Sequence, residues 1–189
     1  ARAMTTVQQA NTIRFGSAKF EVGEDVDSLV DLGAMRGVEF EETWDELRVN
    51  SDNAGVIMVG SSNHQATIRG ELMEINLQNL ALLRGGIDKI EEVQEEGDQK
   101  AAIRLLSGGI STFQPRVVKI TNYNDKNEEF SITVFKATTA QGIQITFPGA
   151  DDEDPAMTPI EMTGTNDVER NPGEQLFMIE DQQGVIPTP

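Results

Sequence analysis

Hydrophobic and polar residues alternate along most of the chain, which is the pattern of half-buried β-strands. Three alternating stretches in the first half cover residues 12–22, 35–49 and 66–73. Further stretches of strand length are rich in β-branched or aromatic residues, and they cover 101–106, 116–121, 129–138, 142–147, 158–163 and 175–180. Clusters of turn-forming residues separate them. Strands that follow one another in this way predict an all-β fold, a two-sheet sandwich or barrel.

One segment has the pattern of a helix instead. Asn76 is a good N-cap residue, and Leu77, Leu80 and Ala81 follow at helical spacing. Two glycines at 85–86 can end the helix in the left-handed conformation. So short a helix is barely stable alone in water, and we therefore expect it to pack on the sheet.

The segment 87–99 fits neither pattern well. It contains six acidic residues and one basic residue. A charge run of this kind usually stays in water, so we expect a solvated loop or a short helix here.

The chain of 189 residues has the length of one domain of ordinary size. Residues 1–11 are polar and without periodicity, and we expect them to form a flexible N-terminal arm. We expect residues 12–181 to form a single β-sandwich domain and residues 182–189 to form a C-terminal tail. Within the domain, the stretch 44–64 is expected to form a long hairpin, because turn-forming residues fill 50–55.

An apolar run in this hairpin allows two interpretations. The run consists of Val56, Ile57, Met58 and Val59. It either forms a buried strand or is exposed, and if it is exposed we expect another subunit to bury it. Trp44, the only Trp, lies at the entry of the hairpin, and a core position is favoured over an interface position. These five residues are our candidate contacts between subunits.

The composition excludes several chemistries. The chain has no Cys, so disulfides, thiol catalysis and Cys-ligated metal sites are excluded. The formal charge is −17 and the pI is about 4.3, which disfavours a surface that grips nucleic acid. No apolar run approaches the ~18 residues that span a bilayer, so we expect no membrane partner.

The residues that could act in catalysis or bind a metal give little support for either role. His64 is the only His and has no recognisable catalytic partner, so we expect it to face solvent in a loop. The acidic run Asp151, Asp152, Glu153 and Asp154 lacks the EF-hand spacing of a calcium site. We interpret it as an acidic surface loop.

Asn and Asp residues in 122–128 are explained by a hairpin turn without a metal. Phosphate-loop, dinucleotide, zinc-protease and nucleophile-elbow motifs are absent. We therefore expect no catalytic residue, no metal, no cofactor and no enzyme activity.

Three stretches, taken in succession, resemble the tail tube proteins of tailed bacteriophages, in particular those with long flexible tails. The first is DLGAMRGVEFEETWDELRVN at 31–50, and the second is ATIRGELMEINLQNLALL at 66–83, where a strand leads directly into a helix. The third spans 116–179 and contains GIQITF, TPIEM and GEQLFMI. The resemblance covers about residues 12–180 and is weakest at 87–99.

The resemblance implies two packed β-sheets flanked by a helix, a ring of six subunits, and rings stacked into a tube in the virion tail. The hairpin and the terminal arm would reach neighbouring subunits. Partners would be further copies, the tape measure, tail terminator and initiator complex, and double-stranded DNA that passes without specific binding. Assembly would take place in the cytoplasm of the host bacterium.

The charge fits such a conduit, because six copies would carry six times −17, or −102, and an acidic bore would repel phosphate. Two other hypotheses stay open. The chain could be a monomeric β-sandwich that binds carbohydrate or a cell surface, although ten aromatic residues offer little for such a site. It could also be a hydrolase that uses a carboxylate pair such as Asp151 and Asp154, which only the abundance of acids supports.

Overall fold

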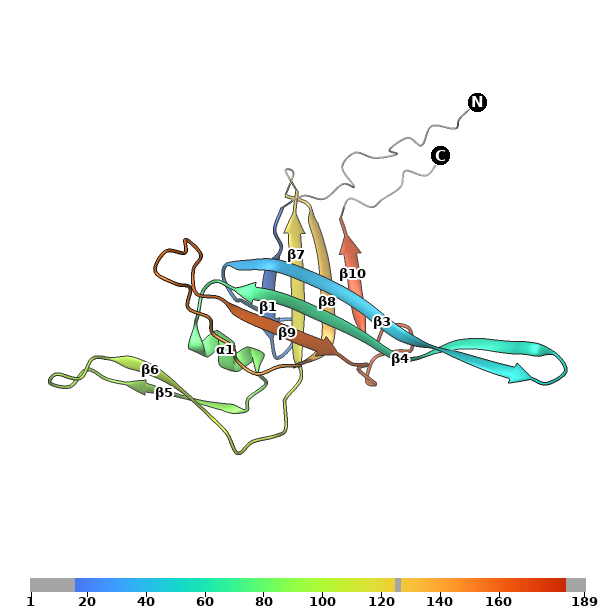
Figure 1. The fold of residues 1–189 in the computed structure, drawn as a ribbon, viewed down its shortest axis with the longest axis horizontal. Coiled ribbons are helices and arrows are strands. Elements are labelled where there is room, and N and C mark those ends of the chain that lie inside the picture. Colours follow the sequence, from blue (N-terminus) through green and yellow to red (C-terminus); the bar gives the residue numbers. More distant parts are fainter. Residues whose placement is uncertain (1–15, 125–126, 183–189) are drawn as a thin grey trace, which may run out of the picture.

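A computed structural model describes residues 16–124 and 127–182, and these residues are folded mainly into β-strands with one short helix (Figure 1). The predicted all-β class is therefore confirmed. The elements in chain order are β1 (Lys19–Gly23), β2 (Val30–Asp31), β3 (Met35–Ser51), β4 (Gly55–Leu72), α1 (Leu77–Leu83), β5 (Asp88–Val93), β6 (Ala102–Ser107), β7 (Arg116–Tyr123), β8 (Glu129–Thr139), β9 (Thr158–Gly164) and β10 (Phe177–Asp181).

Parts of three predictions lie outside the described residues. They are the N-terminal segment 1–11, the start of the first strand with Ile13 and Phe15, and nearly all of the C-terminal tail 182–189. Within the described part of the chain, no helix is long and apolar enough to cross a membrane.

The two layers of the domain belong to one hydrogen-bonded sheet, with strand order β2-β1-β7-β8-β9-β4-β3 and with β10 on β8. The sheet turns at β8, because residues 130–134 of β8 pair with β10 whereas residues 137–139 pair with β9. Strands β9, β4 and β3 thus cross over β1, β7 and β8 as a second layer (Figure 1). All these pairings are antiparallel.

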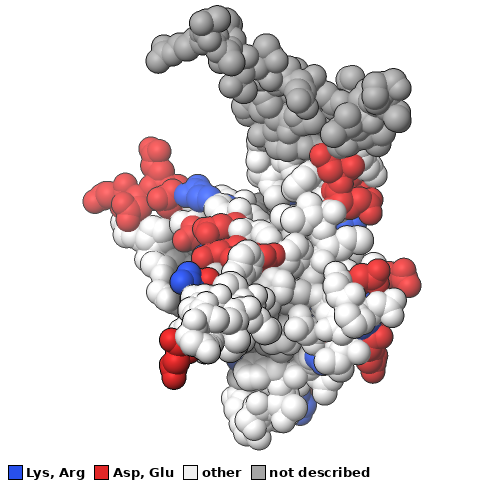
Figure 2. All heavy atoms as spheres, turned by 90° about the vertical axis from the view of Figure 1, so that its right-hand side faces the viewer, with Lys and Arg blue, Asp and Glu red and all other residues white. Residues whose placement is uncertain are grey.

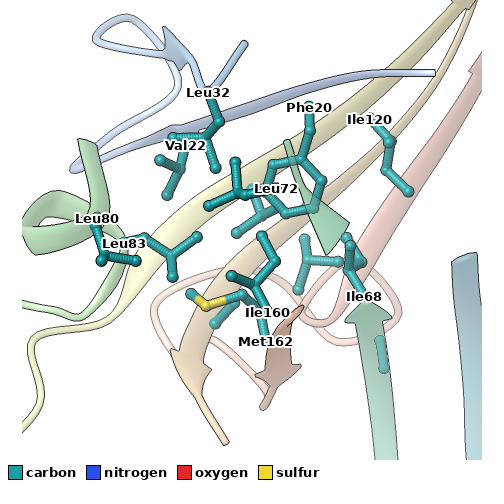
Figure 3. Close-up of a cluster of buried hydrophobic side chains, with 14 of the residues drawn as sticks. Phe20, Val22, Leu32, Ile68, Leu72, Leu80, Leu83, Ile120, Ile160 and Met162 are labelled. Atoms are coloured by element: carbon teal, nitrogen blue, oxygen red, sulfur yellow. The ribbon is translucent and has the colours of Figure 1, made fainter. Parts of the chain in front are cut away.

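The core lies between the two layers and follows from the alternation along the strands (Figure 3). Phe20 and Val22 of β1 point into it and are 0% exposed, as is Val118 of β7. Ile68 of β4 and Met162 of β9 enter it from the other layer.

Helix α1 closes one end of the core with Leu80 and Leu83, which are both buried. The side chain of Asn76 accepts hydrogen bonds from the backbone amides of Gln78 and Asn79 at 3.0 and 3.2 Å. These bonds satisfy two amides that have no partner within the helix. The predicted helix, its N-cap and its packing on the sheet are confirmed.

Gly164 marks the corner of the sheet, where it pairs with Ala66 of β4 and with Ala137 of β8. A Cβ atom at this position would lie 2.3 Å from Cγ1 of the buried Val134. We expect Gly164→Ala to lower the free energy of unfolding by about 1–3 kcal/mol, because the packed core has to shift. Urea unfolding of this variant beside Gly60→Ala tests this. A Cβ at Gly60 meets open space, and equal effects of the two variants would contradict the account.

The prediction for the segment 87–99 is wrong, because the segment contains strand β5 rather than a loop or a short helix. Strand β5 pairs with β6 in a separate two-stranded sheet, where Ile90 lies opposite Leu105. Asp88 is not solvated either: its side chain is 0% exposed and its Oδ2 lies 2.7 Å from Nε of Arg84. Pairing with 102–107 and the ion pair to Arg84, the residue that follows α1, therefore override the charge of the segment.

The segment 142–147 is a second correction, since it does not form the predicted strand. Its only ladder contact among the described residues is an isolated antiparallel bridge between Thr146 and Met157. The remaining predicted strands correspond to β1, β3, β4, β6, β7, β8, β9 and β10.

Candidate functional site

A long hairpin projects from the body of the domain (Figure 1). Strands β3 and β4 pair from Met35 and Leu72 to Ser51 and Gly55. Strand β9, however, pairs only with residues 66–72 of β4. Beyond these residues, the hairpin has no neighbouring strand among the described residues, and we call its outer part, residues 44–64, the arm. Gly55 closes the turn with a φ of +72°, which glycine adopts readily.

The arm is apolar and exposed. The side chains involved are 46% to 62% exposed, and they are Leu47, Val49, Val56, Ile57, Met58 and Val59. Of the two interpretations of the run 56–59, the exposed one is therefore right. Leu47 and Val49 were missed as candidates, although their alternation with charged residues on β3 is visible in the sequence. Large exposed apolar patches are uncommon on monomeric proteins and are typical of surfaces that contact a partner.

The faces of the arm follow from its register. Val49 lies opposite Met58 and shares its face with Leu47, two residues before it. Arg48 and its partner Val59 point to the other side. Apolar side chains thus occupy both faces, so the arm can be covered from two sides.

Aromatic rings fix the root of the arm. The ring of His64 lies 5.8 Å from Trp44 and 6.4 Å from Phe177, centroid to centroid, and both contacts are edge-on. Phe177 in turn meets Phe40 at 5.1 Å. Nε2 of His64 lies 3.5 Å from Oε1 of Glu42. These contacts connect the arm to β10 and set the direction in which it leaves the body.

Two predictions for this root are wrong. Trp44 is 57% exposed, so the favoured core position is contradicted. His64 is exposed, as expected, but it belongs to β4 and not to a loop. The preceding Asn63 has a φ of +54°, and the register shifts between Thr43 and Asp45. Strand pairing therefore continues through the turn-forming residues 60–63 by way of an irregularity, without a turn.

The face of the β9-β4-β3 layer that points away from the core carries an acidic cluster. Arg69 of β4 lies at its centre, 2.9 Å from Glu41, 3.2 Å from Glu39 and 3.9 Å from Glu161. The hydrogen bond to Glu41 and the charges of these three carboxylates raise the pKa of Arg69. Sequence reasoning missed this cluster, although its residues occupy the polar positions of alternating strands.

The acidic run at 151–154 forms an exposed loop, as predicted. Oδ2 of Asp152 accepts a hydrogen bond from the backbone amide of Gly149 at 3.1 Å. Oδ1 of Asp154 lies 3.4 Å from Nη1 of Arg36 in β3. Among the described residues, no group of three or more acidic or histidine side chains is arranged to hold a metal. The loop thus borders the acidic face of the β9-β4-β3 layer through Arg36.

The view along the arm shows how charge is distributed on that side of the molecule (Figure 2). Asp and Glu gather in several separate clusters, some at the edges of this view and one to the left of its centre, whereas Lys and Arg are fewer and scattered. Uncharged surface lies between the clusters. On this side of the molecule, acidic clusters therefore lie around the arm with its exposed apolar side chains.

No family model matches the sequence, and no curated protein matches it. The tube terminating cap of the anti-feeding prophage is similar in structure, with a TM-score of 0.50, 12% identity, and coverage of 95% of this chain and 96% of that chain. A chain of the PVC sheath-tube complex, from an extracellular contractile injection system, has a TM-score of 0.49 and 12% identity, with coverage of 86% and 88%. A chain of the PVC sheath/tube terminator has a TM-score of 0.49 and 12% identity, with coverage of 89% and 96%. The chain therefore shares its overall fold with the tube terminating cap of the anti-feeding prophage.

Proposed function

We propose that this chain is a structural subunit of a tail tube, in which six copies close into a ring and rings stack into a conduit for double-stranded DNA. The exposed apolar arm is the observation that carries the proposal. In the isolated chain it leaves six aliphatic side chains in water, and a neighbouring copy would cover them. The fold shared with a tube terminating cap supports the same role.

The energetics favour an assembly in which many contacts form together. Full burial of one aliphatic side chain contributes about 1.5–3 kcal/mol. Association costs about 4–15 kcal/mol in lost freedom of motion, so one arm partly buried on one partner yields weak binding. In a closed ring, each copy both offers its arm and receives another, so each copy takes part in two interfaces.

The charge supports passage of DNA without capture. The acidic cluster around Arg69 and the adjacent loop with Asp151, Asp152, Glu153 and Asp154 would repel phosphate if they line the bore. We infer that the β9-β4-β3 layer faces the bore, because its outer face is the one that carries this cluster. Salt at high concentration would screen the repulsion.

The remaining partners follow from the tail tube role. The tube would contact a tape measure protein inside, a terminator at one end and an initiator complex at the other, in a virion tail assembled in the host bacterial cytoplasm. In this role the chain is not an enzyme, and it needs no cofactor.

Fluorescence of the single Trp tests the proposal. Trp44 lies at the root of the arm and is 57% exposed. We expect its emission to move to shorter wavelengths as the protein concentration rises and light scattering increases, because assembly covers the arm. If light scattering increases while the emission wavelength stays constant, the arm is not an interface between copies. Rings that form without stacking would indicate a subunit from the end of a tube.

A further inference from the structure

The irregularity in the β3-β4 pairing, at the root of the arm, is a place where the hairpin can bend. On β3 the irregularity contains one residue, Trp44, whereas on β4 it contains two, Asn63 and His64. Extra residues in one strand of a pair interrupt the ladder and bend the strand. The direction of the arm therefore depends on side-chain contacts at this point as well as on the ladder.

The only histidine of the chain takes part in these contacts. Nε2 of His64 lies 3.5 Å from Oε1 of Glu42, which is longer than the usual N–H···O hydrogen bond. The two side chains are 40% and 28% exposed, so water reaches both. The imidazole ring also meets the rings of Trp44 and Phe177. A movement of the His64 ring therefore changes the packing among β3, β4 and β10.

The charged groups around His64 come from β3. Besides Glu42, Asp45 is nearby and accepts a hydrogen bond from Nδ2 of Asn63 at 3.3 Å. The other residues that line the pocket beside His64 are uncharged, and they are Asn166, Pro172, Gly173, Gln175, Leu176 and Phe177. Among the described residues, Glu42 is thus the carboxylate that a proton on His64 would attract most directly.

Protonation changes this contact. Imidazole gains its proton between pH 8 and pH 5, where glutamate side chains ordinarily stay ionised. Both ring nitrogens then donate, and a charge-assisted hydrogen bond to a carboxylate has a length of about 2.7–2.9 Å. We propose that protonation of His64 draws its ring toward Glu42 and stiffens the root of the arm. The inference goes beyond the proposed function, because it concerns the single chain before any assembly.

Hydrogen exchange of the backbone amides in 44–64 tests the inference, at a protein concentration where light scattering shows monomers. A partly exposed ion pair changes an opening equilibrium by about two- to fivefold. After correction for the intrinsic effect of pH on exchange, we expect amides at the root to be protected about two- to fivefold more at pH 5.5 than at pH 7.5. The protein is used without a histidine tag, so that His64 is the only imidazole.

Three variants separate the ion pair from other effects of pH. His64→Gln has a polar side chain that does not titrate, and Glu42→Gln keeps the size of the side chain but not its charge. We expect both to lose the extra protection at pH 5.5. Asp45→Asn is the matched control, because it removes a carboxylate from the same root and leaves the contact between His64 and Glu42 in place. We expect this variant to keep the difference between the two pH values.

The emission of Trp44 gives a second readout, because its ring lies 5.8 Å from that of His64 and a charge at this distance alters the emission of an indole. We expect a step in emission between pH 5 and pH 8 in wild type and none in His64→Gln. Constant emission or equal protection at both pH values in wild type would overturn the inference. A difference in protection that persists in His64→Gln or in Glu42→Gln would do the same. These measurements involve no assembly, so their failure leaves the proposed function as it stands.

Discussion

Replacing both Ile57 and Met58 by Asp will leave the monomer folded and abolish assembly into rings. The two side chains are 60% and 62% exposed, so the change removes little packing from the folded chain. In an assembled ring they would be buried, at about 1.5–3 kcal/mol for each side chain. Two losses raise the concentration needed for assembly by about a hundredfold or more, and the buried carboxylates add to this. Sedimentation and light scattering over a series of protein concentrations measure the effect.

Val168→Asp is the matched control for the arm variant. Val168 is 78% exposed and lies outside the arm, so the same kind of change should leave assembly as it is in wild type. An arm variant that assembles at the same concentration as the Val168 variant would show that the arm is not an interface.

Replacing Phe20 by Ala will lower the free energy of unfolding by about 3–5 kcal/mol. Phe20 is 0% exposed and lies between the two layers, in the same buried cluster as Ile68 of β4 and Met162 of β9 (Figure 3). Removal of the ring leaves a cavity that the paired strands around it cannot close. Urea unfolding of the monomeric protein gives the value.

Phe147→Ala is the control, because it makes the same chemical change at a residue that is 77% exposed. We expect an effect within about 0.5 kcal/mol for this variant in the monomer. Similar losses for the two variants would mean that the core is not where the structure places it.

Local pattern predicts most of the fold, because period-two alternation and helix capping are properties of short segments. The residues of β9 alternate between buried and partly exposed, as the sequence indicates. Asn76 begins the helix where its side chain can cap it. Each of these segments needs only one hydrophobic face that packs on the core. That face is visible in the segment's own sequence.

The failures occur where a distant partner decides. Asp88 and the acids that follow it suggest a loop, yet pairing with 102–107 and the ion pair to Arg84 make a strand. Residues 142–147 alternate as a strand should, yet an extended ladder partner is missing among the described residues. Neither outcome can be deduced from the segment alone.

The candidate site shows the same division. The hairpin residues and the run 56–59 stand out in the sequence, but their exposure depends on how far β9 extends along β4. A core position is favoured for Trp44 in the sequence, but the residue lies beyond the end of β9 and is 57% exposed. The acidic cluster around Arg69 requires the register of three strands, which no single stretch encodes.

Electron microscopy of the purified protein over a range of concentrations tests the central claim most directly. The account predicts rings of six subunits with a central hole, which stack into tubes as the concentration rises. A protein that stays monomeric at every concentration would contradict it.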